Sequence, residues 1–165
     1  MPLNGDPMEK PIGNDDLVWY VAYGSNLYSR RFQEYLTKIN HQGPVPISKP
    51  YAIAHNIYFD RFSKKWNGGV AFLNHLEPGY AYGRAYQLTY DAFKKIQKEE
   101  GWYPVVVQLP LIDGKPAFTF TQVSHGERSK PSDLYLSVIY KGLSETYSKE
   151  EILNLIVYLN ACLSR

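Results

Sequence analysis

The sequence predicts an α+β domain in which helices flank a mostly antiparallel β-sheet that is curled or closed into a barrel-like shape. Three observations support this fold class. Short apolar runs recur along the chain with turn signals between them, helical patterns interrupt these runs, and most of the 15 tyrosines lie in the strand-like runs. A tyrosine ring packs on apolar neighbours while its hydroxyl reaches a polar partner, which suits the wall of a small barrel.

The length of 165 residues and the hydrophobic fraction of 44% fit one globular domain. We assign residues 1–16, rich in Pro, Gly, Asn and Asp, to a flexible tail and residues 17–165 to the domain. The net charge of +2, with Lys and Arg dispersed, gives no reason to expect a nucleic-acid partner. Neither a signal peptide nor a membrane-spanning run is recognisable, so we expect a cytoplasmic protein without a membrane partner, as a monomer or homodimer.

The first half of the chain predicts one helix among several strands. Residues 17–23 are continuously apolar, as in a buried strand, and residues 27–36 place apolar side chains on one helical face. An Asn-Gly turn signal at 67–68 indicates a hairpin. Further strands are expected, in order, over residues 51–59, 70–75 and 81–88.

The second half predicts a helix, a hairpin and two more helices. A polar loop at 124–133 is expected to be a flap at the mouth of a pocket. Ser148 and Glu151 have the spacing of a capping box, which marks the start of the last helix. The elements are expected, in order, over residues 89–100 (helix), 103–112 and 116–123 (strands), and 134–143 and 148–163 (helices). For residues 134–143 a strand is the alternative, and we favour the helix.

Gly24, Ser25 and Asn26 form a corner between the first strand and the helix after it. The start of a helix leaves backbone N–H groups unpaired, and Gly24 permits close approach of a ligand. Ser25 or Asn26 can cap the helix, and the helix dipole adds positive potential, so the corner suits a carboxylate or a phosphate. An ordinary capped turn is the alternative, because the glycine patterns of a P-loop and of a dinucleotide site are absent.

Glu100 is a carboxylate on the apolar face of the helix expected over 89–100. Phe93 and Ile96 share this face with it, whereas Glu99 lies about 100° around the helix. Burial and the negative end of the helix dipole both raise the pKa of Glu100, which suits a general acid/base near neutral pH. The alternative is a solvated helix end with two surface glutamates.

No metal or cofactor is expected. The 4 histidines show no helical pair spacing, and the single Cys162 excludes a Cys-based zinc site and an internal disulfide. We expect Cys162 to have a structural role at the edge of the last helix. Ser25 lacks the flanking glycines of a nucleophile elbow.

Five segments match, in order, the pattern of one protein family: YGSNL at 23–27, WNGGVAFL at 66–73, YGRAYQL at 82–88, IQKEEG at 96–101 and PSDLYLSVIYKG at 131–142. With these segments, residues 17–160 resemble the γ-glutamylcyclotransferases. Two departures concern the substrate. Two residues usual in the family are absent from the EGWY segment, and Phe120 stands where the family has a tyrosine.

The resemblance implies an enzyme of glutathione metabolism that converts a γ-glutamyl amide into 5-oxoproline and a free amine, without a cofactor. It implies that Glu100 is the catalytic acid/base and that the γ-glutamyl group is bound by Tyr23, Gly24, Ser25, Asn26, Leu27 and Tyr135. Whether the substrate is a γ-glutamyl amino acid, a γ-glutamylamine or glutathione stays open. The two departures leave an alternative, which is a non-catalytic binding module for an amino-acid or peptide-like ligand on the same scaffold.

Overall fold

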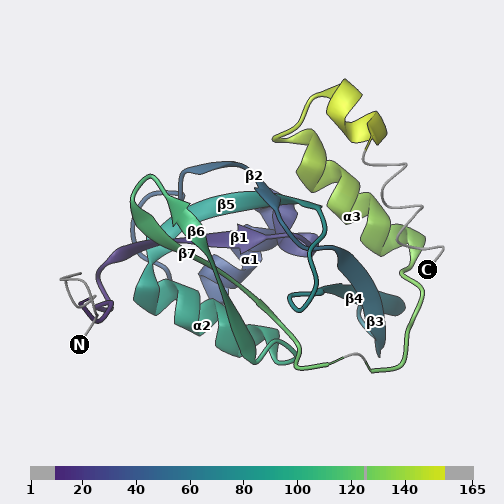
Figure 1. Ribbon diagram of the computed structural model, residues 1–165, viewed down its shortest axis with the longest axis horizontal. Helices are drawn as coiled ribbons and strands as arrows, with labels where there is room; N and C mark the ends of the chain where they lie inside the picture. The colour runs from purple at the N-terminus through teal and green to yellow at the C-terminus, as the bar shows by residue number, and fades with distance from the viewer. Residues whose placement is uncertain (1–9, 125, 155–165) are drawn as a thin grey trace.

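The structure, a computed structural model, describes residues 10–124 and 126–154. Its first half contains β1 (Leu17–Ala22), the 3₁₀ turn η2 (Ser25–Leu27), α1 (Ser29–Lys38), β2 (Ser48–Ile53), β3 (Ile57–Ser63), β4 (Gly68–Leu73) and β5 (Ala81–Thr89). The second half contains α2 (Tyr90–Glu100), β6 (Val105–Ile112), β7 (Lys115–Thr121) and α3 (Asp133–Ser144), as Figure 1 shows.

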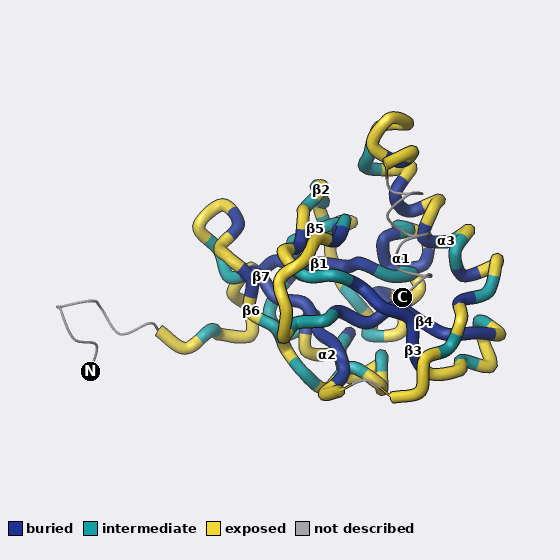
Figure 2. Tube along the Cα trace, turned by 45° about the vertical axis from the view of Figure 1, so that its right-hand side comes forward, coloured by how far each residue is buried: buried dark blue, intermediate teal, exposed yellow. Residues whose placement is uncertain are grey.

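β1 is the central strand of a five-stranded sheet with the order β2-β5-β1-β7-β6. It runs antiparallel to β5 and parallel to β7. Val18, Tyr20 and Ala22 pack in one hydrophobic cluster with residues of α1 and α2, whereas Trp19 and Val21 pack in a second cluster with the β3–β4 hairpin and α3. The continuous apolar run therefore corresponds to a strand covered on both faces, and Figure 2 shows it in the buried colour.

The α+β class is confirmed, but the barrel-like closure is not. Within the described residues, the five-stranded sheet is open, with β2 and β6 at its edges, and β3 and β4 pair in a separate antiparallel hairpin. The apolar pattern of a strand reports which of its faces are buried and does not identify the strand it pairs with. The sequence pattern therefore could not show that β3 and β4 pair with each other outside the main sheet.

A turn divides the segment that was expected to be one strand over residues 51–59. The Gly79 N–H donates to the Ala54 carbonyl at 3.0 Å, and the Tyr80 N–H donates to the side-chain oxygen of Asn56 at 2.8 Å. The prediction of a single strand is wrong because these partners, distant in sequence, fix a turn between β2 and β3.

The helix expected over 134–143 and the hairpin before it are confirmed. Ser132 is the N-cap of α3, and its hydroxyl accepts a hydrogen bond from the Tyr135 N–H at 3.1 Å. Asp113 and Gly114 connect β6 to β7 with positive φ angles of 50° and 74°. Two consecutive residues with positive φ match the right-handed twist of the flanking strands, as in a type I′ turn.

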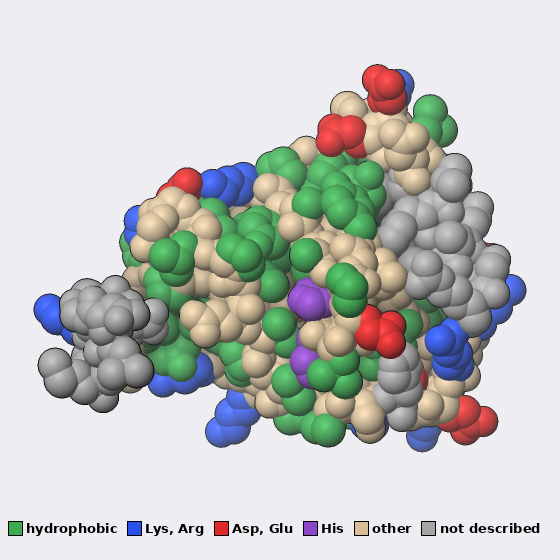
Figure 3. Space-filling view, in the orientation of Figure 1, with side chains coloured by type: hydrophobic (Ala, Val, Ile, Leu, Met, Phe, Trp, Pro, Cys, Tyr) green, Lys and Arg blue, Asp and Glu red, His purple; other side chains and the backbone are tan. Residues whose placement is uncertain are grey.

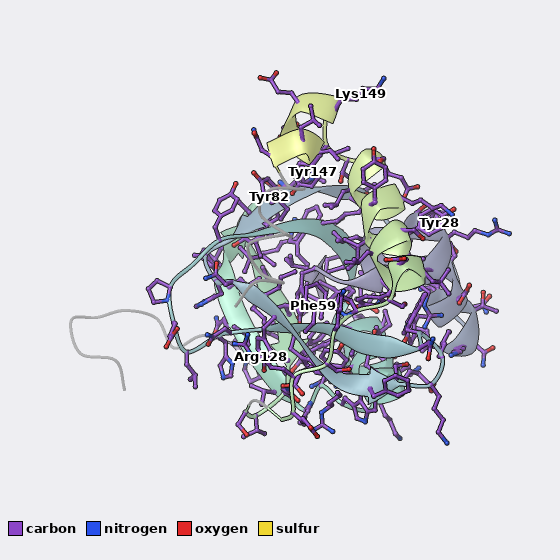
Figure 4. All side chains as sticks on the ribbon, turned by 90° about the vertical axis from the view of Figure 1, so that its right-hand side faces the viewer. Tyr28, Phe59, Tyr82, Arg128, Tyr147 and Lys149 are labelled. Atoms are coloured by element: carbon purple, nitrogen blue, oxygen red, sulfur yellow. The ribbon has the colours of Figure 1, made fainter. Side chains whose placement is uncertain are left out.

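The chain after α3 packs back onto β5. Tyr147 and Tyr82 lie close together in Figure 4. Their rings pack edge to face, with centroids 5.3 Å apart. The predicted capping box is present, because the Ser148 N–H donates to the Glu151 carboxylate at 2.9 Å and the Glu151 N–H donates to the Ser148 hydroxyl at 3.2 Å. The structure describes the last predicted helix as far as residue 154.

Residues 13–16, which we placed in the flexible tail, bind the start of α2. The Tyr90 N–H donates to the Asp16 carbonyl at 2.9 Å, and the Asp91 N–H donates to the Asn14 carbonyl at 3.0 Å. The first N–H groups of a helix have no partner within it, so this stretch satisfies two of them. Part of the expected tail therefore belongs to the folded domain.

Candidate active site

The corner between β1 and α1 is the 3₁₀ turn η2. The Leu27 N–H donates to the Gly24 carbonyl at 3.1 Å and closes the turn. Two side chains of β5 hold it in place, because the Tyr86 hydroxyl donates to the Asn26 carbonyl at 2.8 Å and the Arg84 guanidinium donates to the Leu27 carbonyl at 3.0 Å. The backbone of the corner is therefore fixed by the sheet without a ligand.

Neither Ser25 nor Asn26 caps α1, which begins later than predicted. Its N-cap is Tyr28, which makes no side-chain cap hydrogen bond. The Glu145 carboxylate instead accepts hydrogen bonds from the Ser29 N–H at 2.8 Å and from the Ser29 hydroxyl at 2.5 Å. The Glu145 carboxylate thus occupies the positive, N-terminal end of α1. The prediction that this end of the helix adds its positive potential to the corner is therefore wrong.

Gly24 lets the Tyr135 hydroxyl approach the corner. A Cβ atom at position 24 would lie 2.9 Å from the Tyr135 hydroxyl oxygen and 3.6 Å from the Cβ atom of Ala71. That hydroxyl accepts a hydrogen bond from the Ala71 N–H at 3.0 Å and another from the backbone of Ser25. Because Gly24 has no side chain, the Tyr135 hydroxyl can contact both β4 and the corner. These contacts join α3 to β4 and to the corner.

Glu100 lies at the end of α2 on the face that the sequence predicted. It is half-buried and follows the buried Phe93 and Ile96 on that face, whereas Glu99 is exposed. The Asn26 amide donates to the Glu100 Oε1 at 3.0 Å. This bond connects α2 to the corner, so the two features that the sequence singled out separately are adjacent.

Burial raises the pKa of the Glu100 carboxyl to about 7. Hydrogen bonds from Tyr35 and Asn26, and the positive charges of Arg31 and Lys38, act in the opposite direction. The balance leaves a carboxyl group that can take up and release a proton near neutral pH.

Glu100 and the corner line a narrow inner cavity of about 30 Å³. This volume accommodates roughly two water molecules, so only the tip of a ligand fits there. The residues that line this cavity include all but one of those that the sequence assigned to the site: Tyr23, Gly24, Ser25, Asn26, Glu100 and Tyr135.

An outer cavity of about 240 Å³ adjoins the inner one and shares Ser25, Glu100, Tyr103 and Tyr135 with it. Its size means that most of a ligand whose tip enters the inner cavity would lie in this space. The other lining residues come from α1, the β3–β4 hairpin and the segment after α2: Arg31, Tyr35, Ser63, Lys65, Trp66, Val70, Gly101 and Trp102.

Leu27 is the predicted substrate-binding residue that lines neither cavity. Its side chain is 1% exposed and packs in the core cluster that contains Ile139 and Leu143 of α3. A Cβ atom on Gly142 would lie 2.6 Å from the Leu27 Cβ atom. Leu27 therefore anchors the corner on α3, and only its neighbours can contact a ligand.

The sequence reasoning missed three tyrosines around Glu100. Tyr35 is hydrogen-bonded to the Glu100 carboxylate, and the Tyr20 hydroxyl accepts from the Asn26 amide at 3.1 Å. The Tyr103 hydroxyl donates to a β4 carbonyl at 2.8 Å. Each lies in an ordinary helix, strand or loop pattern, so no local signal distinguished it from the other tyrosines of the chain.

Both departures from the family pattern lie at the cavities. Phe120 lines the inner cavity, and its carbonyl accepts a hydrogen bond from the Tyr23 hydroxyl at 2.7 Å. The short EGWY segment places Trp102 on the outer cavity alone and Tyr103 on both cavities. The departures therefore affect the space available to a ligand.

The loop at 124–133, expected to be a flap, is bound to the β3–β4 hairpin. The Gly126 N–H donates to the Asp60 carboxylate at 2.9 Å, and the Gly69 N–H donates to the Lys130 carbonyl at 2.9 Å. None of the loop residues that the structure describes lines either cavity. The prediction of a flap over the pocket therefore finds no support.

Residues 10–124 and 126–154, which the structure describes, contain neither a metal-binding cluster nor a membrane-spanning helix. This part of the chain contains no group of three or more His, Cys, Asp or Glu side chains that could hold a metal ion. It also has no helix long and apolar enough to cross a membrane. Figure 3 shows Lys and Arg scattered around the margin of one face.

Cys162 lies outside the described residues, so its expected structural role stays a prediction.

Comparison with known proteins finds similarity in structure and not in sequence. No family model matches the chain. A search of the curated proteins also finds no match.

Three solved structures resemble the fold. An uncharacterized human protein, loc79017, has a TM-score of 0.63 and 20% identity, covering 82% of this chain and 83% of that one. A γ-glutamyl cyclotransferase has a TM-score of 0.59 and 19% identity, covering 79% and 80% of the two chains. YkqA from Bacillus subtilis has a TM-score of 0.65 and 23% identity over 88% of this chain, which spans 55% of YkqA. On this evidence, the chain has the γ-glutamyl cyclotransferase-like fold.

Proposed function

We propose that the protein is a γ-glutamylcyclotransferase, which converts a γ-glutamyl amide into 5-oxoproline and a free amine. The observation that carries the proposal is the Glu100 carboxyl, whose pKa is about 7, in a cavity that it shares with Gly24, Ser25 and Asn26. The likeness of the fold to a γ-glutamyl cyclotransferase supports the same reaction.

The reaction requires proton transfer and no nucleophile from the protein. The α-amine of the substrate attacks its own γ-carbonyl carbon, and the tether gives this step a high effective molarity. Glu100 as the carboxylate takes a proton from the α-ammonium group, and the new C–N bond closes a five-membered ring. The protonated Glu100 then gives that proton to the leaving nitrogen as the old C–N bond breaks. The ring nitrogen still carries one proton too many, which passes to the Glu100 carboxylate and from there to the released amine. A pKa of about 7 makes both forms of Glu100 accessible at neutral pH.

The corner offers polar groups to the γ-glutamyl head group. The Leu27 N–H is used within the turn and the Ser25 N–H donates to the Tyr135 hydroxyl, which leaves the Asn26 N–H as the candidate for a carboxylate or for the developing oxyanion. The Asn26 Oδ1 is buried and has no hydrogen-bond partner among the described residues. An ammonium group bound beside Glu100 would satisfy this acceptor.

The test is release of 5-oxoproline from γ-glutamyl amino acids, γ-glutamylamines and glutathione, measured by chromatography. Glu100→Gln keeps the size of the side chain but cannot accept a proton, so turnover should fall by a factor of roughly 10² to 10⁴. Glu99→Gln is the matched control and should retain wild-type turnover, because Glu99 is exposed. Thermal unfolding shows whether both variants fold. Loss of turnover in Glu99→Gln with survival in Glu100→Gln would contradict the proposal.

A non-catalytic binding module is the second candidate, and Phe120 is the observation that favours it. Phe120 lines the inner cavity at a position where the family resemblance leads us to expect a tyrosine. A binding module would bind γ-glutamyl peptides in calorimetry and release no 5-oxoproline from any of them. Its affinity would also stay within a few-fold when Glu100 is replaced by Gln, since no proton transfer is involved.

A further inference from the structure

Arg31 is a buried cation whose guanidinium is only partly satisfied. The residue is 7% exposed, pairs with Glu34, and donates from Nη2 to the Tyr35 hydroxyl at 3.3 Å. The guanidinium also lies over the rings of Tyr35 and Trp66, at 4.8 and 5.5 Å from their centroids. Its Nε has no hydrogen-bond partner among the residues that the structure describes. A buried donor left unpaired is costly, so a ligand that accepts from it gains affinity.

Arg31 and Lys65 give the outer cavity a positive balance. Both residues line it, and Glu100 is the carboxylate beside them. Partial desolvation of its ammonium group, and after it the repulsion from Arg31, lower the pKa of Lys65, although the residue as a whole is exposed. A bound anion would relieve this repulsion, whereas a second ammonium group would increase it.

The walls around these cations are aromatic. Trp66 and Tyr35 lie under the Arg31 guanidinium, and Trp102 lines the same cavity beside Gly101. Flat aromatic surfaces favour a large apolar or aromatic side chain on the ligand. The cavity therefore combines a carboxylate-binding cation with an apolar surface, and a bulky amino acid presents both features.

We propose that the outer cavity binds the leaving part of the substrate and that Arg31, assisted by Lys65, recognises a free α-carboxylate on it. This inference rests on the proposed function and selects among the substrates that the reaction allows. It favours γ-glutamyl amino acids with a bulky aromatic side chain over γ-glutamylamines. The inner cavity and the corner are left for the γ-glutamyl head group.

Two substrates that differ only in this carboxylate test the proposal: γ-glutamyl-phenylalanine and γ-glutamyl-phenethylamine. The wild type should prefer the first by about 10- to 100-fold in kcat/KM, the range of a charge-assisted, bidentate hydrogen bond. Arg31→Gln should reduce this preference to within about threefold, and Arg31→Lys should retain part of it. Arg30→Gln, at the exposed neighbouring position, is the matched control and should keep the full preference.

The ratio of kcat/KM for the two substrates separates recognition of the carboxylate from effects on the pKa of Glu100. Arg31 also lowers the pKa of Glu100, so its replacement changes the proton transfer for both substrates alike and leaves their ratio unaffected. An equal loss for both substrates would overturn the proposal, because Arg31 would then serve the head group or Glu100 alone. If Arg31→Gln does not fold, Lys65→Gln at an exposed position should still reduce the preference by about twofold or more. An unchanged ratio in that variant would also overturn the proposal.

Binding without turnover distinguishes failure of this inference from failure of the proposed function. In the Glu100→Gln protein, calorimetry should show tighter binding of γ-glutamyl-phenylalanine than of γ-glutamyl-phenethylamine. If the wild type releases no 5-oxoproline but this difference in affinity persists, the proposed function is wrong and the carboxylate subsite stands. Equal affinities for the two compounds would overturn the subsite, whatever the turnover.

Discussion

The carboxyl group of Glu100 holds its proton more tightly in the folded protein than in the unfolded chain. Its folded pKa of about 7 exceeds the ordinary value of 4.5 because burial disfavours the carboxylate. Between these two values the folded state binds more protons than the unfolded state, so the free energy of unfolding falls as pH rises. The stability that protonated Glu100 contributes is complete below pH 4.5 and is lost as pH rises through about 7.

Glu100→Gln removes this pH dependence. Relative to the wild type, the variant should gain about 2–3 kcal/mol in free energy of unfolding between pH 4 and pH 8. Urea denaturation at both pH values measures the gain, and Glu99→Gln should follow the wild type. A constant difference between wild type and Glu100→Gln across this range would show that the Glu100 pKa is not raised by folding.

At the residue scale, the sequence predicted what depends on local geometry. The inward direction of Glu100 follows from its spacing to Phe93 and Ile96 on one helix, and the structure has that spacing. Leu27 was assigned to the substrate because it belongs to the motif, but it is a core residue. Leu27 is buried because it packs against α3, which is more than 100 residues away in the chain. No local sequence pattern could therefore indicate its burial.

At the element scale, Glu145 connects three segments. It follows α3, accepts two hydrogen bonds from Ser29 at the start of α1, and pairs with Arg84 of β5 at 2.9 Å. Burial alone would raise the pKa of Glu145, but the hydrogen bonds from Ser29 and the charge of Arg84 prevail and lower it. Because Arg84 also binds the Leu27 carbonyl, this connection supports the corner.

Glu145→Gln should therefore reduce the free energy of unfolding at pH 7 by about 1 kcal/mol, the usual worth of a helix cap. The folded pKa is depressed, so the stabilisation is present above the unfolded value of 4.5 and is lost as pH falls through the folded pKa. Urea denaturation should show the difference from wild type shrinking at pH 3. Glu150→Gln, at an exposed position, is the control and should have little effect at either pH. A difference as large at pH 3 as at pH 7 would mean that charge is not involved.

Helices and tight hairpins were predictable from sequence, and strand partners were not. The capping residues of α3 and the turn between β6 and β7 lie within a few positions of the elements they define. A turn divides the segment at 51–59 into β2 and β3. This turn is held by hydrogen bonds from Gly79 and Tyr80, which are distant from it in the sequence. The cap of α1 likewise comes from Glu145 and not from its own turn.

At the scale of the whole molecule, the cavities lie where separate layers meet. α1, α2, α3, β1, β7, the β3–β4 hairpin and the segment after α2 all contribute lining residues. Most of the residues that the sequence motifs singled out line the inner cavity. The outer cavity was not predictable, because Arg31, Lys65 and Trp102 approach one another only in the assembled fold.

A ligand in these cavities contacts several layers at once, so it should stabilise the whole domain. Saturating γ-glutamyl-phenylalanine at about 100 times its Kd should add about 2.7 kcal/mol to the free energy of unfolding of the Glu100→Gln protein, in which turnover is expected to be slow. Thermal unfolding with increasing ligand measures this, and the phenethylamine analogue at the same concentration should shift the Tm less. Binding seen in calorimetry with no shift in Tm would indicate a ligand that also binds the unfolded chain.

The β3–β4 hairpin stands apart from the five-stranded sheet, yet the turn at its tip supplies Lys65 and Trp66 to the outer cavity. No main-sheet hydrogen bond of the described residues passes through residues 64–67. The tip can therefore be lengthened or exchanged without disturbing the strand ladder that carries the corner, and Glu100 on α2 keeps its place. For the proposed reaction, residues 64–67 are accordingly the segment to diversify in order to change the preference for the leaving amine.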